Sequence, residues 1–145
     1  MRVHFVIHES FESAGAYLPW AESRGYTITW SHVYAGEAVP ANADGFDMLV
    51  VFGGPQSPRT TLAECPYFDS HAEQHLINQA IAARKIVVGI CLGSQLIGEA
   101  LGAKVCQQIG NKYSAFYSYP IFQRDSIISA NMAKGIPEYS RQVHL

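Results

Sequence analysis

The residue best placed to do chemistry is Cys91, which has a glycine two positions before it and another two positions after it, Gly89 and Gly93. A β-branched apolar run at 85–88 precedes the cysteine, and apolar residues at helical spacing follow it over 96–102. This order is typical of a nucleophile elbow, in which a strand turns sharply into a helix. The helix N-terminus would favour the thiolate form of Cys91. These residues favour a nucleophilic cysteine, with a buried structural cysteine as the alternative.

A second glycine-rich turn lies upstream, where the apolar run 48–52 leads into Gly53, Gly54 and Pro55. A continuous apolar run is typical of a central parallel strand that is covered on both faces. Ligands of parallel sheets bind outside the carboxyl ends of the strands. We therefore expect Gly53, Gly54 and Cys91 to lie at the same edge of a sheet.

Strand and helix patterns alternate along the chain, which predicts an α/β sheet with helices on both faces and right-handed crossovers. The expected strands are 3–7, 26–33, 48–52, 86–90 and 103–106, and the expected helices are 13–24, 69–84 and a short one after Cys91. Pro19 should kink or shorten the first helix. The inner side of the long helix is expected to carry Ala72, His75, Leu76, Gln79, Ile81 and Ala82.

Two segments carry a resemblance to a known family. The heptapeptide Gly89-Ile90-Cys91-Leu92-Gly93-Ser94-Gln95 resembles the nucleophile motif of class I glutamine amidotransferases, in particular the GMP synthase-like branch, and Asp47 to Pro58 resembles that family's strand and Gly-Gly-Pro turn. The resemblance weakens after about Val105. It implies a flavodoxin-like three-layer α/β sandwich with a mostly parallel central sheet. We predict an amidotransferase-like core at 1–106 and a divergent C-terminal segment of the same domain at 107–145.

The resemblance also implies a reaction. Cys91 would attack the side-chain amide of glutamine, or a γ-glutamyl amide, and form a thioester while ammonia leaves. The tetrahedral oxyanion needs preorganised N–H donors, which the elbow supplies at Leu92 and which the resemblance supplies at Gly54. The resemblance further assigns Gly53 and Gln95 to the substrate side of the site. The implied partner is a synthetase subunit that uses the ammonia, and no cofactor is implied.

A catalytic cysteine normally works with a histidine that an acid orients, and the family's downstream His-x-Glu pair is not found in this sequence. Gln142-Val143-His144-Leu145 resembles the start of that motif, but a tail histidine is the favoured interpretation. His8 is the best local substitute base. A changed reading frame and a true short variant that takes its base from a partner chain both explain the C-terminal segment. Two functions therefore stay open: a glutaminase, and a catalytically incomplete binding or subunit-contact module.

Composition excludes several other classes. The net charge is −2 with no Lys/Arg cluster, which argues against nucleic-acid and membrane-surface binding. The three cysteines lack the spacing of metal ligands and predict neither a disulfide framework nor a metal site. Cys65 is expected to be structural or merely exposed, and Cys106 to lie in the core. Residues 1–7 are interpreted as a strand rather than an export signal, so we expect a cytoplasmic location. An uncovered sheet edge would favour a homo-oligomer.

Overall fold

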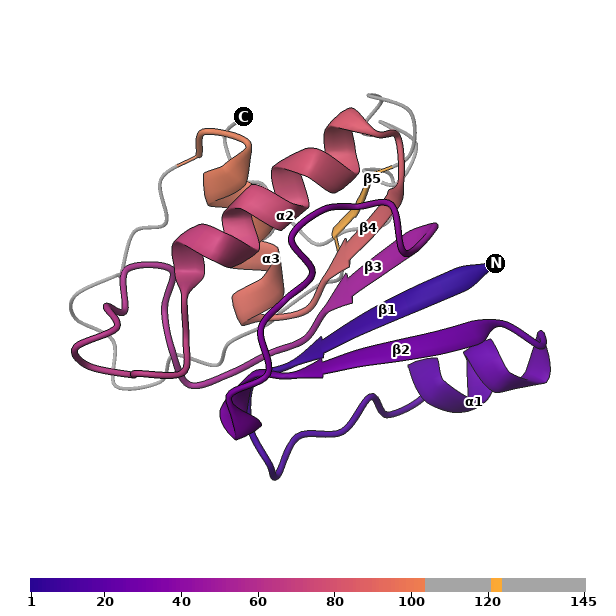
Figure 1. Ribbon diagram of the computed structural model, residues 1–145, viewed down its shortest axis with the longest axis horizontal. Helices are drawn as coiled ribbons and strands as arrows, with labels where there is room; N and C mark the ends of the chain where they lie inside the picture. The colour runs from indigo at the N-terminus through magenta and orange to yellow at the C-terminus, as the bar shows by residue number, and fades with distance from the viewer. Residues whose placement is uncertain (104–120, 124–145) are drawn as a thin grey trace, which may run out of the picture.

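The computed structural model describes residues 1–103 and 121–123, which form a five-stranded sheet. The strand order is β2-β1-β3-β4-β5, with β1 at Arg2–Ile7, β2 at Thr27–His32, β3 at Met48–Val51, β4 at Ile86–Gly89 and β5 at Ile121–Gln123. The first four strands in chain order are mutually parallel, whereas β5 runs antiparallel to β4 (Figure 1). The predicted, mostly parallel sheet is confirmed.

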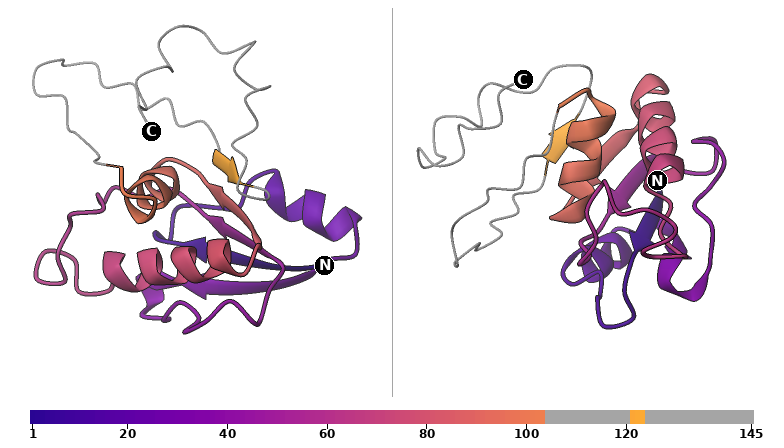
Figure 2. Two further views of the ribbon diagram at one scale, coloured as in Figure 1. Left: turned by 90° about the horizontal axis from the view of Figure 1, so that it is seen from above. Right: turned by 90° about the vertical axis from the view of Figure 1, so that its left-hand side faces the viewer.

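Helices cover both faces of this sheet (Figures 1 and 2). The helices are α1 at Tyr17–Ser23, α2 at Ser70–Ala82 and α3 at Leu92–Ala100, and a short 3-10 turn, η1, spans Val33–Ala35. The two longer helices, α2 and α3, lie together on one face, and α1 lies on the other. The flavodoxin-like three-layer arrangement is therefore confirmed for the described part of the chain.

Side chains of the central strands alternate between two cores. In β3, Leu49 and Val51 point to the core beneath α2 and α3, whereas Met48 and Val50 point to the core on the α1 side. All four are buried. Because both faces are covered, every position of such a strand must be apolar, which explains why this segment reads as an unbroken apolar run.

The first helix is shorter than the sequence pattern predicts. It begins at Tyr17 rather than near residue 13, so that Pro19 falls in its first turn. Backbone N–H groups in a first turn have no partner within the helix, so a proline there removes no hydrogen bond. Pro19 thus shortens the helix, as expected, and does not kink it.

The predicted inner side of α2 is correct for Leu76 and Ile81 and wrong for His75 and Ala82. The buried residues of this helix are Ser70, Glu73, Leu76, Ile77 and Ala80, whereas His75 and Ala82 are exposed. Apolar periodicity omitted Glu73 because a carboxylate rarely enters a core unless it is paired. Asp69 caps the helix by accepting hydrogen bonds from the backbone N–H groups of His71 and Ala72.

Residues 104–120 and 124–145 lie outside the described part of the chain, and with them the expected strand 103–106, Cys106, His144 and the proposed boundary at 106. The division into a core and a divergent segment stays a prediction. Among the helices that are described, none combines the length and the apolar character needed to cross a lipid bilayer.

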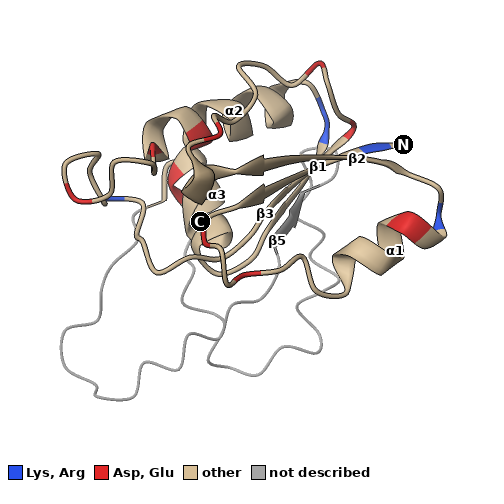
Figure 3. Cartoon of the chain, turned by 60° about the horizontal axis from the view of Figure 1, so that its bottom comes forward, with Lys and Arg blue, Asp and Glu red and all other residues tan. Residues whose placement is uncertain are grey.

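Charged residues are sparse on the described surface (Figure 3). Asp47 accepts a hydrogen bond from the Arg2 guanidinium at 2.9 Å, and the Lys85 ammonium lies 4.0 Å away. The hydrogen bonds that Arg2 donates from its guanidinium and from its backbone N–H lower the pKa of Asp47 to about 2. The two basic side chains at this end of the sheet are thus partnered by a carboxylate instead of forming a free basic patch.

His4 gives the fold a sensitivity to acid. Its ring is buried in β1, lies next to the hydroxyls of Thr29 and Ser31, and stacks on Phe46. Burial lowers the pKa of His4 to about 4, from an ordinary value near 6.5. An unfolded chain therefore binds this proton at a higher pH than the folded chain does, so the stability that His4 contributes is lost as the pH falls from 6.5 toward 4.

We expect this coupling to lower the free energy of unfolding by about 3 kcal/mol between pH 7 and pH 4. Urea unfolding across that range, for the natural chain and for His4→Gln, measures it. Glutamine keeps an amide for Thr29 and Ser31 but does not titrate, so the variant should show a shallower decline. Parallel declines in the two proteins would contradict the assignment to His4.

Candidate active site

Cys91 lies in a sharp turn between β4 and α3. Its backbone has φ 53° and ψ −111°, in the left-handed half of conformational space that side chains with a Cβ rarely adopt. Its carbonyl accepts hydrogen bonds from the N–H groups of Ser94 and Gln95 and from the Ser94 hydroxyl. The thiol therefore belongs to a strained residue that the first turn of a helix holds in place.

The flanking glycines permit this turn because backbone occupies the space of their missing side chains. A Cβ on Gly93 would lie 2.0 Å from the carbonyl oxygen of Val51, and a Cβ on Gly89 would lie 2.5 Å from the carbonyl of Gly93. Real Cβ atoms do not approach other atoms so closely. The turn is thus built directly against strand β3, and no larger residue fits at either position.

The loop that follows β3 lies beside the elbow. A Cβ on Gly53 would be 3.4 Å from the Cβ of Cys91, and a Cβ on Gly54 would be 3.0 Å from Leu92 and 3.1 Å from His8. The two Gly-rich motifs are therefore neighbours, as their positions at strand ends predict. The N–H groups of Gly54 and Leu92 donate no hydrogen bond to any residue of the described ranges, which leaves both available to a ligand.

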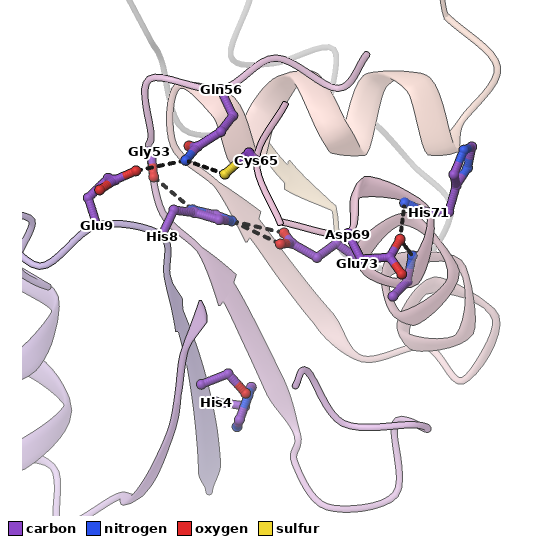
Figure 4. A network of polar contacts seen from close by, with 11 residues as sticks. His4, His8, Glu9, Gly53, Gln56, Cys65, Asp69, His71 and Glu73 are labelled. Atoms are coloured by element: carbon purple, nitrogen blue, oxygen red, sulfur yellow. Dashed lines mark hydrogen bonds and ion pairs between the residues drawn. The ribbon is translucent and has the colours of Figure 1, made fainter. Parts of the chain in front are cut away.

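A buried ion pair lies directly behind this loop (Figure 4). The His8 side chain is 0% exposed and that of Glu73 is 2% exposed. The Nδ1 of His8 is 2.7 Å from the carbonyl oxygen of Gly53, and its Nε2 is 2.9 and 3.2 Å from the two Glu73 oxygens. Because a carbonyl oxygen can only accept, Nδ1 carries a proton and donates to Gly53, and Nε2 is engaged by the Glu73 carboxylate.

This environment controls the protonation of His8. Burial alone would lower its pKa, but the hydrogen bond and charge of Glu73, together with the Gly53 carbonyl, raise it above the ordinary value. The protonated form of His8 is thus favoured, and both of its ring nitrogens are already engaged. The expectation that His8 could serve Cys91 as a substitute base is wrong, because a base needs a free nitrogen.

Sequence reasoning missed Glu73. The sequence feature that could have identified Glu73 as buried is its position on the same helix face as Leu76, Ile77 and Ala80. A buried carboxylate requires a cationic or hydrogen-bonding partner. The candidate partner for the Glu73 carboxylate was His8, which directly follows β1 at the same edge of the sheet as the two glycine-rich turns.

A second polar cluster ties three loops together at the rim. One carboxylate oxygen of Glu9 accepts hydrogen bonds from the Gln56 amide at 2.7 Å and from the Tyr67 hydroxyl at 2.8 Å. The same amide is 3.7 Å from the sulfur of Cys65, which is partly buried. Cys65 thus joins the hydrogen bonding of the rim. Glu12 lies on the other side of Gly53, where burial raises its pKa although the charge of His8 lowers it.

The remaining expected site residue is Gln95, which lies on the first turn of α3 and is partly exposed. His71 and His75 are both exposed on α2, contrary to the expectation that His75 lies on its inner side. Within residues 1–103 and 121–123, no three His, Cys, Asp or Glu side chains are grouped so that they could hold a metal ion.

Comparisons with known proteins agree with this geometry. The family model for glutamine amidotransferase class-I matches residues 20–144. The chain is 84% identical over 107 residues to the glutamine amidotransferase-like protein YfeJ of Salmonella typhimurium, an alignment that covers 74% of this chain and 45% of YfeJ. The chain thus spans less than half the length of this relative.

Solved structures share the fold. The crystal structure of SMU.1228c is 52% identical with a TM-score of 0.70, over 72% of this chain and 44% of that one. A glutamine amidotransferase from Thermotoga maritima is 22% identical with a TM-score of 0.62, over 70% of this chain and 43% of that one. A glutamine amido transferase from Methylobacillus Flagellatus is 26% identical with a TM-score of 0.61, over 70% and 39%. From the family match and the elbow geometry together, this chain belongs to the class I glutamine amidotransferase family.

Proposed function

We propose that the chain carries the nucleophile half of a glutaminase site. The Cys91 thiolate attacks the side-chain carbonyl carbon of glutamine, or of a γ-glutamyl amide, and forms a carbon–sulfur bond. The carbon–nitrogen bond then breaks, and the nitrogen leaves as ammonia after taking up a proton. Water hydrolyses the thioester to glutamate and returns the thiol. The observation that carries this proposal is the strained Cys91 turn beside the Gly53–Gly54 loop, where the N–H of Gly54 has no partner among the described residues.

Each neighbouring group has a role in this scheme. The N–H groups of Gly54 and Leu92 would stabilise the oxyanion that forms on the attacked carbonyl. Gly53 leaves room for the substrate side chain next to Cys91, and Gln95 would contact the rest of the substrate. The ammonia would pass to a synthetase partner. We retain a cytoplasmic location and self-association as predictions, the latter to be checked by sedimentation.

A second function is favoured by one specific observation. Both nitrogens of His8 are engaged, so within the described residues this histidine cannot take the thiol proton. A chain without a base would act as a binding or subunit-contact module that keeps the elbow. Under the glutaminase proposal, the thiol proton must be taken by a group other than His8.

Glutamate release from glutamine by the 145-residue chain, with Cys91→Ala as control, tests the proposal. We expect release that depends on Cys91. In parallel, a chloromethyl ketone analogue of glutamine should alkylate Cys91 at least about tenfold faster than Cys65 or Cys106, as mapped by mass spectrometry. Folded protein that releases no glutamate but labels selectively at Cys91 would favour the binding module. Equal labelling of the three cysteines would argue against both the nucleophile and the substrate assignment.

A further inference from the structure

The buried pair of His8 and Glu73 acts on one particular atom of the site. The Nδ1–H of His8 donates to the carbonyl oxygen of Gly53 at 2.7 Å, and Glu73 on α2 holds the other side of the ring at 2.9 Å (Figure 4). The ring also meets Phe68 edge-on at 5.7 Å, which limits its rotation. Three elements, β1, the loop after β3 and helix α2, are thus connected through one side chain.

The bonded carbonyl is part of the peptide group that links Gly53 to Gly54. All peptide bonds of the described residues are trans, and in a trans peptide the C=O and the N–H point in opposite directions. Fixing the Gly53 carbonyl toward His8 therefore fixes the Gly54 N–H away from His8. That N–H has no partner in the described structure, and Gly53 itself lies against Cys91.

Two adjacent glycines need such a restraint. Glycine adopts almost any backbone conformation, so a Gly-Gly peptide can turn over with little steric resistance. A turned peptide would present a carbonyl oxygen, which repels an oxyanion, where an N–H is required. Preorganised donors stabilise a transition state because they need not reorient during the reaction. A charged donor makes a stronger hydrogen bond to the carbonyl than a neutral donor would.

We propose that His8 and Glu73 are positioning residues that lock the Gly53–Gly54 peptide with its N–H directed to the oxyanion site beside Cys91. This inference rests on the proposed function of the elbow. Glu73 keeps His8 doubly protonated and oriented, His8 holds the carbonyl, and neither residue touches the substrate. A buried ion pair need not stabilise a fold, because desolvation of the two charges offsets their attraction. The contact of this pair with the Gly53 carbonyl is therefore what points to a role in the site.

The decisive variants change the pair without emptying its space. Glu73→Gln keeps a hydrogen-bond acceptor for His8 but removes the negative charge. His8→Asn keeps an N–H donor at the position of Nδ1 but loses the contact with the Glu73 carboxylate. The matched control is His4→Asn, which alters a buried histidine in β1, the strand that His8 follows; His4 contacts Thr29 and Ser31 rather than the loop. Circular dichroism establishes that each variant is folded.

Two alkylating reagents separate oxyanion stabilisation from thiol reactivity. The chloromethyl ketone analogue of glutamine presents a carbonyl to the site, whereas iodoacetamide reacts by direct displacement of iodide and needs no oxyanion donor. We expect Glu73→Gln to slow the chloromethyl ketone at Cys91 by about tenfold or more, and iodoacetamide by less than about threefold. With glutamine, kcat should fall by a similar factor while KM changes little. Equal slowing of both reagents, or an effect of the same size in His4→Asn, would overturn the proposal.

Nuclear magnetic resonance gives a readout that does not depend on substrate. In the natural chain, the two ring nitrogens of His8 should show the ¹⁵N shifts of an imidazolium, and the Gly54 amide should give one sharp signal. In Glu73→Gln that signal should broaden or double, while it stays single in His4→Asn. An unchanged Gly54 signal would overturn the locking role even if the enzyme is active. A wild-type chain that neither turns over glutamine nor reacts with the ketone would instead overturn the proposed function and leave the locking of the peptide to be decided by these signals.

Discussion

Replacement of Gly93 by alanine is expected to abolish the folded state. The new Cβ would lie 2.0 Å from the carbonyl oxygen and 2.7 Å from the carbonyl carbon of Val51, the last residue of the central strand β3. Neither strand β3 nor helix α3 can withdraw without opening the core that contains Val51, Leu92 and Leu96. We expect a loss of about 4 kcal/mol or more, comparable to the whole stability of many domains. Urea unfolding monitored by circular dichroism measures it.

A matched substitution on the same helix supplies the control. A Cβ on Gly98 would meet nothing nearer than the Cβ of Ala103, at 3.9 Å, which is ordinary packing distance. Gly98→Ala should therefore raise the free energy of unfolding by about 0.5–1 kcal/mol, because alanine is the better helix former. If both alanine variants changed stability alike, steric exclusion at Gly93 would not be the reason for its glycine.

The second large effect is expected at Cys91, where substitution by glycine should abolish the thiol chemistry while it relieves the backbone strain. Cys91→Gly removes the thiol and must eliminate all alkylation at position 91 and all Cys91-dependent glutamate release. The same change relieves the strained backbone at φ 53°, because glycine has no Cβ to conflict with this conformation. We expect the free energy of unfolding of Cys91→Gly to be about 1 kcal/mol higher than that of Cys91→Ala, because alanine keeps the Cβ.

Comparing the two variants is cleaner than comparing either with the natural chain, since both lack the thiol. Thermal melts and urea titrations of the pair give the difference directly. A more stable Cys91→Ala would mean that the turn carries no strain that matters energetically. Residual glutamate release in both variants would show that another group performs the hydrolysis.

The four parallel strands could be predicted because they are short apolar runs that alternate with segments of helical periodicity, whereas β5 at Ile121–Gln123 was not among the expected strands. Residues 48–52 are a clear case, since a strand buried on both faces allows no polar position. The length of the first helix was harder to predict. Ser13 to Ala16 continue its pattern, yet the helix begins only at Tyr17, where Pro19 is acceptable in the first turn.

The proximity of Gly53, Gly54 and Cys91 followed from topology, because each lies at the carboxyl end of a parallel strand. The ion pair of His8 and Glu73 did not follow. Local sequence patterns treat a glutamate as solvent-exposed, and only the three-dimensional approach of α2 to the end of β1 provides the cation that makes its burial acceptable. The role of His8 was misread for the same reason, since its orientation depends on a residue 65 positions away.

The position of β1 between β2 and β3 has a consequence for how this chain reaches its native state. The parallel pairings join Val3 to Ile28, Val3 to Met48 and Met48 to Ile86, so every ladder among these strands closes a long loop. Closing a loop lowers the chain entropy before the stabilising long-range contacts form, so folding rates fall as contacts become less local. Refolding should therefore take milliseconds to seconds rather than microseconds. During synthesis the first strand must wait for about fifty residues before its second neighbour exists, and the strained Cys91 turn can close only after both.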